Sequence, residues 1–182
     1  MTVNEFFKEP QEEVQEVFSK IKYFKKIDTL LGYKLIDLKK LPYIKVVNFI
    51  EQYTNGQIIL SISELTGLDT KKILNSNHKN FLYFVSLCNS YLLEINELYK
   101  FLESIESEND NSTEDLKTVG IERLNVLGQM NVIDELANGD ITKHETIENL
   151  PFERVFSKIV RDKLKNVIKL DYEALLRERS KR

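Results

Sequence analysis

The stretch "NFLYFVSLCNSYLLEINELYKFL", residues 80–102, decides the fold. Apolar side chains surround almost the whole circumference of its first half, and no Gly or Pro interrupts it. A helix that is apolar on every side is usually buried among other elements. The sequence therefore predicts a mainly α protein built around this helix, with little or no β structure.

The first forty residues predict one helix and one short extended piece. Pro10 is placed just inside a helix start, where its missing N–H costs nothing. The helix is expected over residues 10–26, because apolar residues recur at three-and-four spacing: Val14, Val17, Phe18, Ile21 and Phe24. After Gly32 the apolar residues alternate over residues 33–38, which favours a short extended segment.

The segment "QIILSISELTGLDTKKILNS", residues 57–76, predicts two short helices that meet at a corner. Gly67 can take the left-handed conformation that ends the first helix. Asp69 can then accept hydrogen bonds from the free amides of the second helix.

Two similar stretches, "LPYIKVVNFI" at residues 41–50 and "LPFERVFSKI" at 150–159, raise the question of a repeat. In each, Pro is expected in the first turn of a helix and an aromatic residue follows it. The similarity does not extend beyond these ten-residue stretches, so we interpret them as one way of starting an amphipathic helix, used twice. The first helix should stop at "TNG", residues 54–56, whereas the second continues.

The acidic stretch around residues 103–116 divides the chain. Residues 103–115 hold six carboxylates and no Lys or Arg, which is typical of a solvated linker. We therefore expect a helical domain over residues 1–102 and a helical C-terminal region over 117–182. In the latter, one or two helices should end at Asn138 and Gly139, and residues 140–149 should form a connector that can include one helical turn.

The last predicted helix has one apolar stripe and basic outer faces. The stripe consists of Phe152, Val155, Phe156, Ile159, Val160, Leu164, Val167 and Ile168, spaced as on one side of a helix of about five turns. Lys and Arg outnumber Asp and Glu beyond residue 153. This long basic amphipathic helix has two interpretations: the stripe packs within the chain, or it docks on a partner.

Composition narrows the class of protein. Of the 182 residues, 42% are hydrophobic and 30% charged, which is ordinary for a globular chain. A single cysteine excludes an internal disulfide. The acidic start does not resemble a signal peptide and no apolar run is long enough to span a bilayer. These features predict no membrane partner, and the cytoplasm is the default location for a chain that needs no oxidising compartment.

Residues suited to catalysis are few. Cys88 lies in an apolar run, where a buried inert thiol is expected rather than a nucleophile. His78 lies in the polar "NSNHKN" and is expected at the surface. Asp140, His144 and Glu148 would share one helical face and could approach a metal, but a solvated connector explains them equally. We therefore expect no catalytic residue, no metal and no cofactor, and predict that the chain is not an enzyme.

The segment "ILSISELTGLDTKKILNSNHKNFLYF", residues 59–84, read with the preceding "YKLIDLKKLPYIKVVNFIEQ", resembles tail assembly chaperones and related small morphogenesis proteins of tailed bacteriophages. The helix, "TG", short helix, polar turn and helix are the shared pattern, and "LGQMNVIDEL" is a looser match, so the resemblance covers about residues 33–136. It implies a non-enzymatic role: a virion component such as a connector, tail or packaged protein, or a chaperone that keeps a phage protein soluble. The basic C-terminal helix departs from the pattern shared with that family. The resemblance also implies a location in the virion or in the host cytoplasm.

Two binding hypotheses follow, and the first is preferred. In the first, the protein forms homo- or hetero-oligomers with other phage structural or tail proteins through candidate partner-binding residues on the last helix: Phe152, Val155, Phe156, Ile159, Val160, Leu164 and Ile168. In the alternative, it is a nucleic-acid-binding regulator whose phosphate contacts come from the basic side of the same helix: Arg154, Lys158, Arg161, Lys165 and Lys169.

Overall fold

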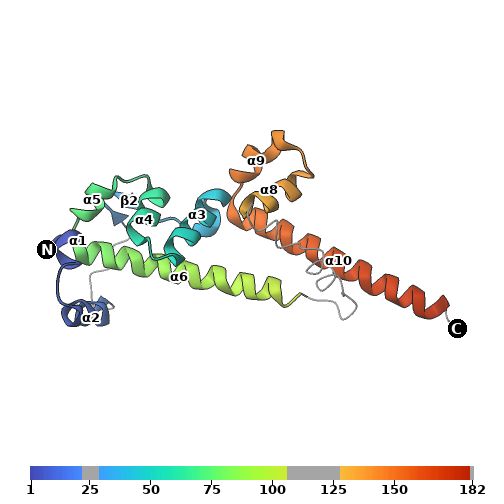
Figure 1. Cartoon of the computed structure of the whole chain (residues 1–182), viewed down its shortest axis with the longest axis horizontal. Coiled ribbons are helices and arrows are strands. Elements are labelled where there is room, and N and C mark those ends of the chain that lie inside the picture. Colours follow the sequence, from blue (N-terminus) through green and yellow to red (C-terminus); the bar gives the residue numbers. More distant parts are fainter. Residues whose placement is uncertain (22–28, 106–127, 181–182) are drawn as a thin grey trace. The chain divides into compact units, whose positions relative to one another are not determined.

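The computed structural model describes residues 1–21, 29–105 and 128–180. Over these ranges the chain is mainly α-helical and its only sheet has two strands, so the expected fold class is confirmed. The chain divides into two compact units, Met1–Asn96 and Glu97–Arg182. Figure 1 shows the elements of both, which are described one unit at a time.

The first unit has short elements before one long helix. A two-residue turn, with φ of 50° at Leu31 and 85° at Gly32, joins the antiparallel strands and pairs Leu30 with Tyr33. Two positive φ values in succession are what tight hairpin turns require. The elements are α1 (Val3–Phe6), α2 (Gln11–Ser19), β1 (Thr29–Leu30), β2 (Tyr33–Lys34), a 3₁₀ turn (Leu38–Lys40), α3 (Tyr43–Thr54), α4 (Ile58–Thr66), α5 (Thr70–Leu74) and α6 (His78–Glu103).

The first half of α6 provides the core of this unit, as its composition predicts. Phe81 and Phe84 are fully buried, and Cys88 lies one turn further along the helix with no exposed surface. Phe49 of α3 and Ile62 of α4 are also fully buried in this unit. The predicted central helix is therefore confirmed, starting two residues earlier than expected.

The corner between α4 and α5 follows the sequence prediction closely. Gly67 has φ of 72° and its amide donates to the Ser63 carbonyl at 2.8 Å, which ends α4. The Asp69 carboxylate accepts from the amides of Lys71 at 2.8 Å and Lys72 at 3.3 Å, which caps α5. These two residues turn the chain within a few positions.

The N-terminal segment differs from expectation. The spacing of apolar residues did not predict helix α1. Thr2 and Glu5 form a reciprocal cap at its start: the Glu5 amide donates to Thr2 Oγ1 at 3.2 Å, and the Thr2 amide donates to Glu5 Oε2 at 2.8 Å. The next helix, α2, begins after Pro10 and ends at Ser19, earlier than the predicted residue 26. Residues 22–26 of that prediction lie outside the described ranges.

The prediction that His78 lies at the surface is wrong. Only 8% of the residue is exposed, its Nδ1 lies 2.9 Å from the Met1 carbonyl oxygen, and its ring stacks on Phe6 with centroids 5.3 Å apart. The burial has a long-range cause, because the Val3 amide donates to the Ser76 carbonyl at 3.0 Å and holds α1 against the start of α6.

The second unit contains the end of α6, α8 (Gln129–Ala137), a 3₁₀ turn (Ile141–Lys143), α9 (His144–Glu148) and α10 (Phe152–Ser180). Helix α8 ends at Ala137 and is followed by Asn138 and Gly139, both with positive φ, as predicted. The connector holds more helix than the one turn expected, because the 3₁₀ turn leads directly into α9. Helix α10 has 29 residues, about eight turns rather than five. The predicted acidic linker lies outside the described ranges beyond residue 105, as do residues 117–127 of the predicted helical region.

The two similar stretches both start helices, but each proline stands one position earlier than expected. Pro42 and Pro151 immediately precede the first helical residue, and their carbonyls accept the Val46 and Val155 amides, each at 3.2 Å. The following aromatic residue is buried in both cases, Tyr43 in one and Phe152 in the other. Both stretches therefore use the same local device, in which the proline carbonyl opens the hydrogen-bond ladder and the aromatic ring anchors the first turn.

Candidate interaction surface on the C-terminal helix

An aromatic cluster anchors the start of α10 within the second unit. The ring of Tyr99 on α6 meets Phe152 and Phe156 edge to face, with centroids 6.4 and 5.6 Å away, and the two Phe rings stack at 5.8 Å. Burial raises the pKa of Tyr99 above its usual value. The ring pairs among Tyr99, Phe152 and Phe156 stabilise the unit beyond the free energy gained from burying their apolar surface.

A polar contact ties the next turns of α10 to the same helix end. Lys163 Nζ donates to the Leu102 carbonyl at 2.7 Å, near the C-terminus of α6, and the lysine is half-buried. The Leu102 carbonyl also accepts from the Ile105 amide at 3.3 Å. A cation at this end of α6 is favoured because the last carbonyls of a helix carry the negative end of its dipole. Helix α10 is thus held over its first three turns.

Beyond these turns, α10 leaves large apolar side chains exposed. Leu164, Ile168, Tyr172 and Leu176 follow one another at intervals of four residues, and Leu175 lies beside them. We call these five residues the distal stripe. Their exposed fractions range from 41% at Leu164 to 66% at Ile168. Figure 1 shows α10 continuing as one straight helix through this region. Contiguous exposed apolar side chains of this kind mark surfaces that bind other molecules.

The predicted partner-binding residues fall into three groups along α10. Phe152, Val155 and Phe156 are buried in the core of the unit, Ile159 and Val160 are half-buried, and Leu164 and Ile168 are exposed. The last two therefore remain as direct candidates for contact. Sequence reasoning missed Tyr172, Leu175 and Leu176, although the four-residue interval that begins at Phe152 continues through Tyr172 to Leu176.

The basic candidates share a single face of α10. Their spacing of four, three, four and four residues places all five within one sector of the helix, over about 22 Å of its length. Lys158 forms an ion pair with Asp162, and Lys169 Nζ lies 3.9 Å from Glu173 Oε1. Among the described residues, no ion pair is formed by the remaining exposed cations of this face, Arg154, Arg161 and Lys165.

The possible metal-binding residues are not gathered into one site. Asp140 accepts from Lys143 at 2.8 Å and from the Thr142 hydroxyl at 2.6 Å, and these bonds lower the pKa of its carboxyl to about 2. His144 Nε2 instead lies 3.1 Å from Asp134 Oδ1. No group of three or more His, Cys, Asp or Glu side chains suited to a metal occurs in the described part of the chain.

Cys88 is in the apolar environment that its sequence context predicts. The residue is fully buried, and burial raises the pKa of its thiol to about 12. Because the thiolate is the reactive form of cysteine, a thiol with this pKa is a poor nucleophile at neutral pH.

No protein family, curated protein or solved structure was found to match this chain. Within the described ranges, no helix combines the length and apolar character needed to cross a bilayer. The candidate surface therefore has to be interpreted from its own chemistry.

Proposed function

We propose that the protein acts by protein–protein contact through the distal stripe of α10, as a non-enzymatic structural or assembly protein of a tailed bacteriophage. The proposed protein–protein contact rests on the difference between the two parts of α10: Phe152 in its first turn is buried, whereas Ile168 further along is exposed. The phage role is supported by the resemblance of residues 33–136 to tail assembly chaperones and related morphogenesis proteins.

The apolar area on the distal stripe supports a protein partner. A side chain the size of Leu, Ile or Tyr gains about 1.5–3 kcal/mol when it passes from water to a fully buried site. A row of them spaced four apart matches the ridges with which helices pack against one another. Leu164 to Leu176 span about 18 Å, enough for several turns of a facing helix.

A charge introduced into the stripe tests this contact. Leu164→Asp/Ile168→Asp places two carboxylates where a partner helix would bury them, so we expect loss of the partner from affinity-purified complexes made in phage-infected cells. Asn166→Asp, an exposed position between the two, adds a charge to the same turn outside the stripe and should leave capture unchanged. Equal capture by wild type and double variant would contradict the proposal.

Quantitative mass spectrometry separates the two phage roles. Stoichiometric copies in purified particles indicate a virion component. Absence from particles, together with a tail protein in the purified complexes, indicates a chaperone. Absence from particles and from complexes with any phage protein would refute the phage role.

A nucleic-acid-binding regulator is the second candidate, favoured by the alignment of five cations on one face of α10. Phosphate contacts release counterions, so affinity for labelled duplex DNA should fall steeply as salt rises. Lys165→Gln/Lys169→Gln should flatten this dependence, whereas Lys71→Gln/Lys72→Gln, two exposed lysines of α5, should not. No retention of DNA at low salt would exclude this function.

A further inference from the structure

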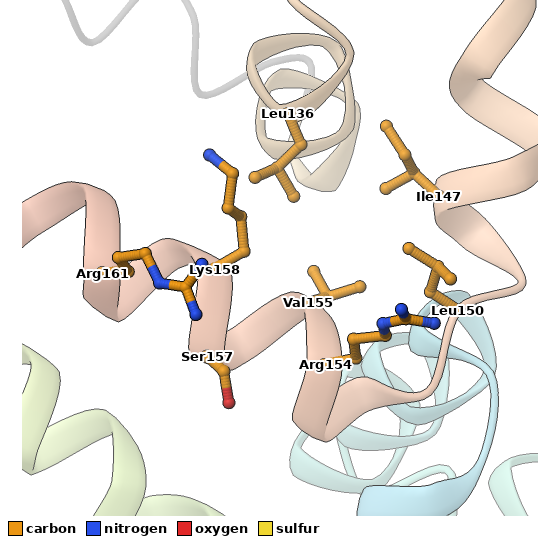
Figure 2. Close-up of a pocket in the computed structure, with 8 residues that line it drawn as sticks. All are labelled: Leu136, Ile147, Leu150, Arg154, Val155, Ser157, Lys158 and Arg161. Atoms are coloured by element: carbon orange, nitrogen blue, oxygen red, sulfur yellow. The ribbon is translucent and has the colours of Figure 1, made fainter.

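A groove of about 460 Å³ lies at the start of α10, separate from the distal stripe. Figure 2 shows four apolar side chains converging on it: Leu136 of α8, Ile147 of α9, Leu150 from the segment before α10, and Val155 of α10. Ile147 and Val155 are buried, whereas Leu136 and Leu150 are half-buried, so the floor is apolar and open to solvent. Its volume lies within the range of roughly 300–1,000 Å³ that is common for binding pockets.

Cations line one side of this groove. Arg154, Lys158 and Arg161 project from successive turns of α10 and are exposed. Lys158 is paired with Asp162, while neither arginine forms an ion pair with any described residue. None of the described residues that line the groove is acidic. The groove therefore presents two uncompensated guanidinium groups beside an apolar floor.

This combination selects one class of occupant. A nucleic acid would satisfy the cations but leave the apolar floor uncovered, and none of the lining residues is an aromatic ring on which a base could stack. A lipid chain requires a cavity that encloses most of its surface, and here four of the lining side chains are exposed. A peptide that carries carboxylates and large apolar side chains satisfies both parts, because guanidinium groups bind carboxylates with paired hydrogen bonds.

We propose that this groove binds an acidic, amphipathic segment of a partner protein. Arg154 and Arg161 are about 10 Å apart along the helix axis, so they match carboxylates two turns apart on a helical segment, whose apolar side chains enter between Leu136 and Val155. This inference rests on the proposed role in protein–protein contact and specifies the chemistry of one partner segment. A second copy of this chain is the less suitable occupant, because the half-buried Val14 and Val17 of its acidic helix α2 are small and already partly covered.

Selection from a random 12-residue peptide library with the full chain as bait tests the inference. The selected peptides should be enriched in both Asp or Glu and Leu, Ile or Phe. Fluorescence anisotropy with the most frequent peptide should show binding weakened about tenfold by Arg154→Gln/Arg161→Gln, as expected for two exposed charge pairs acting together. Lys165→Gln/Lys169→Gln removes the same charge from the next turns of α10 and should change affinity by less than about twofold.

Three results would overturn the inference: no peptide selected, selected peptides without acidic residues, or equal effects of the two double variants. Self-association of the wild type that Arg154→Gln/Arg161→Gln abolishes would also overturn it, by making a second copy the occupant. The arginine variants leave Leu164 and Ile168 intact. Failure of the groove proposal can thus be distinguished from failure of the distal-stripe contact, which the Asp variants of those residues test separately.

Discussion

The asymmetry of α10 can be tested by truncating one apolar side chain at each end of the helix. Phe152→Ala removes a fully buried ring that contacts both Tyr99 and Phe156. The lost transfer free energy and the remaining cavity together cost about 3–5 kcal/mol of unfolding free energy. Because Phe152 lies in the core of the second unit, this unit should bear the loss.

Ile168→Ala should cost much less, although it lies on the same helix. The side chain is 66% exposed, so only about a third of the roughly 2–3 kcal/mol for full burial is at stake, or about 0.7–1 kcal/mol. The higher helix propensity of alanine offsets about 0.4 kcal/mol of this loss. The net expectation is a loss of about 0.5 kcal/mol.

Urea unfolding followed by far-ultraviolet circular dichroism measures both variants, and hydrogen exchange of α10 peptides reports where protection is lost. We expect the two losses to differ by about 3 kcal/mol. Similar losses for Phe152→Ala and Ile168→Ala would mean that the distal stripe is buried within the folded chain, and would refute the asymmetry on which the proposed contact depends.

Three further predictions concern individual residues. Because burial raises the pKa of Cys88 from 9.0 to about 12, the contribution of its neutral thiol to the free energy of unfolding should be fully present below pH 9.0 and be lost as pH rises toward 12. Urea unfolding of Cys88→Ala should show a smaller decrease in stability over this pH range than the wild type. The Asp140 carboxyl should titrate near pH 2 by nuclear magnetic resonance, and Lys143→Met should move that midpoint toward 3.8, while an unchanged midpoint would contradict the assigned cause. Gly67→Ala meets no neighbouring atom but must adopt φ of 72°, so thermal unfolding should show a loss of about 1–2 kcal/mol, and no loss would mean that the corner does not need a left-handed residue.

The elements with strong local signals were predictable from sequence. The long apolar run of α6 and the regular spacing in α10 each specify a helix without help from distant residues. Gly67 and Asp69 act on backbone groups a few positions away, so the corner between α4 and α5 could also be predicted. The short strands β1 and β2 gave a weaker signal, because two residues are too few for alternation to be distinctive.

The environment of His78 could not be predicted in the same way. Its burial depends on Phe6 and on the Met1 carbonyl, more than 70 positions away in the chain. Helix α1 itself could have been recognised from the spacing of Thr2 and Glu5, which is that of a capping box. A polar turn in the sequence therefore became a buried contact through tertiary packing.

The division of the α10 stripe into a buried and an exposed part also depends on tertiary packing. Phe152 and Ile168 obey one spacing rule, so the sequence predicted a single stripe and left open whether it packs in the chain or on a partner. They differ in burial: Tyr99, from a distant segment, packs on Phe152 and Phe156 in the first turns of α10, whereas Ile168 is 66% exposed. The groove also required the structure, because its floor combines Leu136, Ile147 and Val155 from three helices.

Site-specific photocrosslinking at Ile168 tests the proposed function most directly. A photoreactive amino acid at this position of the full chain, expressed in phage-infected cells, should form a crosslink to a phage protein that mass spectrometry identifies. The same amino acid at Lys71, an exposed residue of α5 in the first unit, should not reach that protein. Crosslinks from Ile168 to nucleic acid alone, or none that exceed those from Lys71, would contradict a protein–protein contact at the distal stripe.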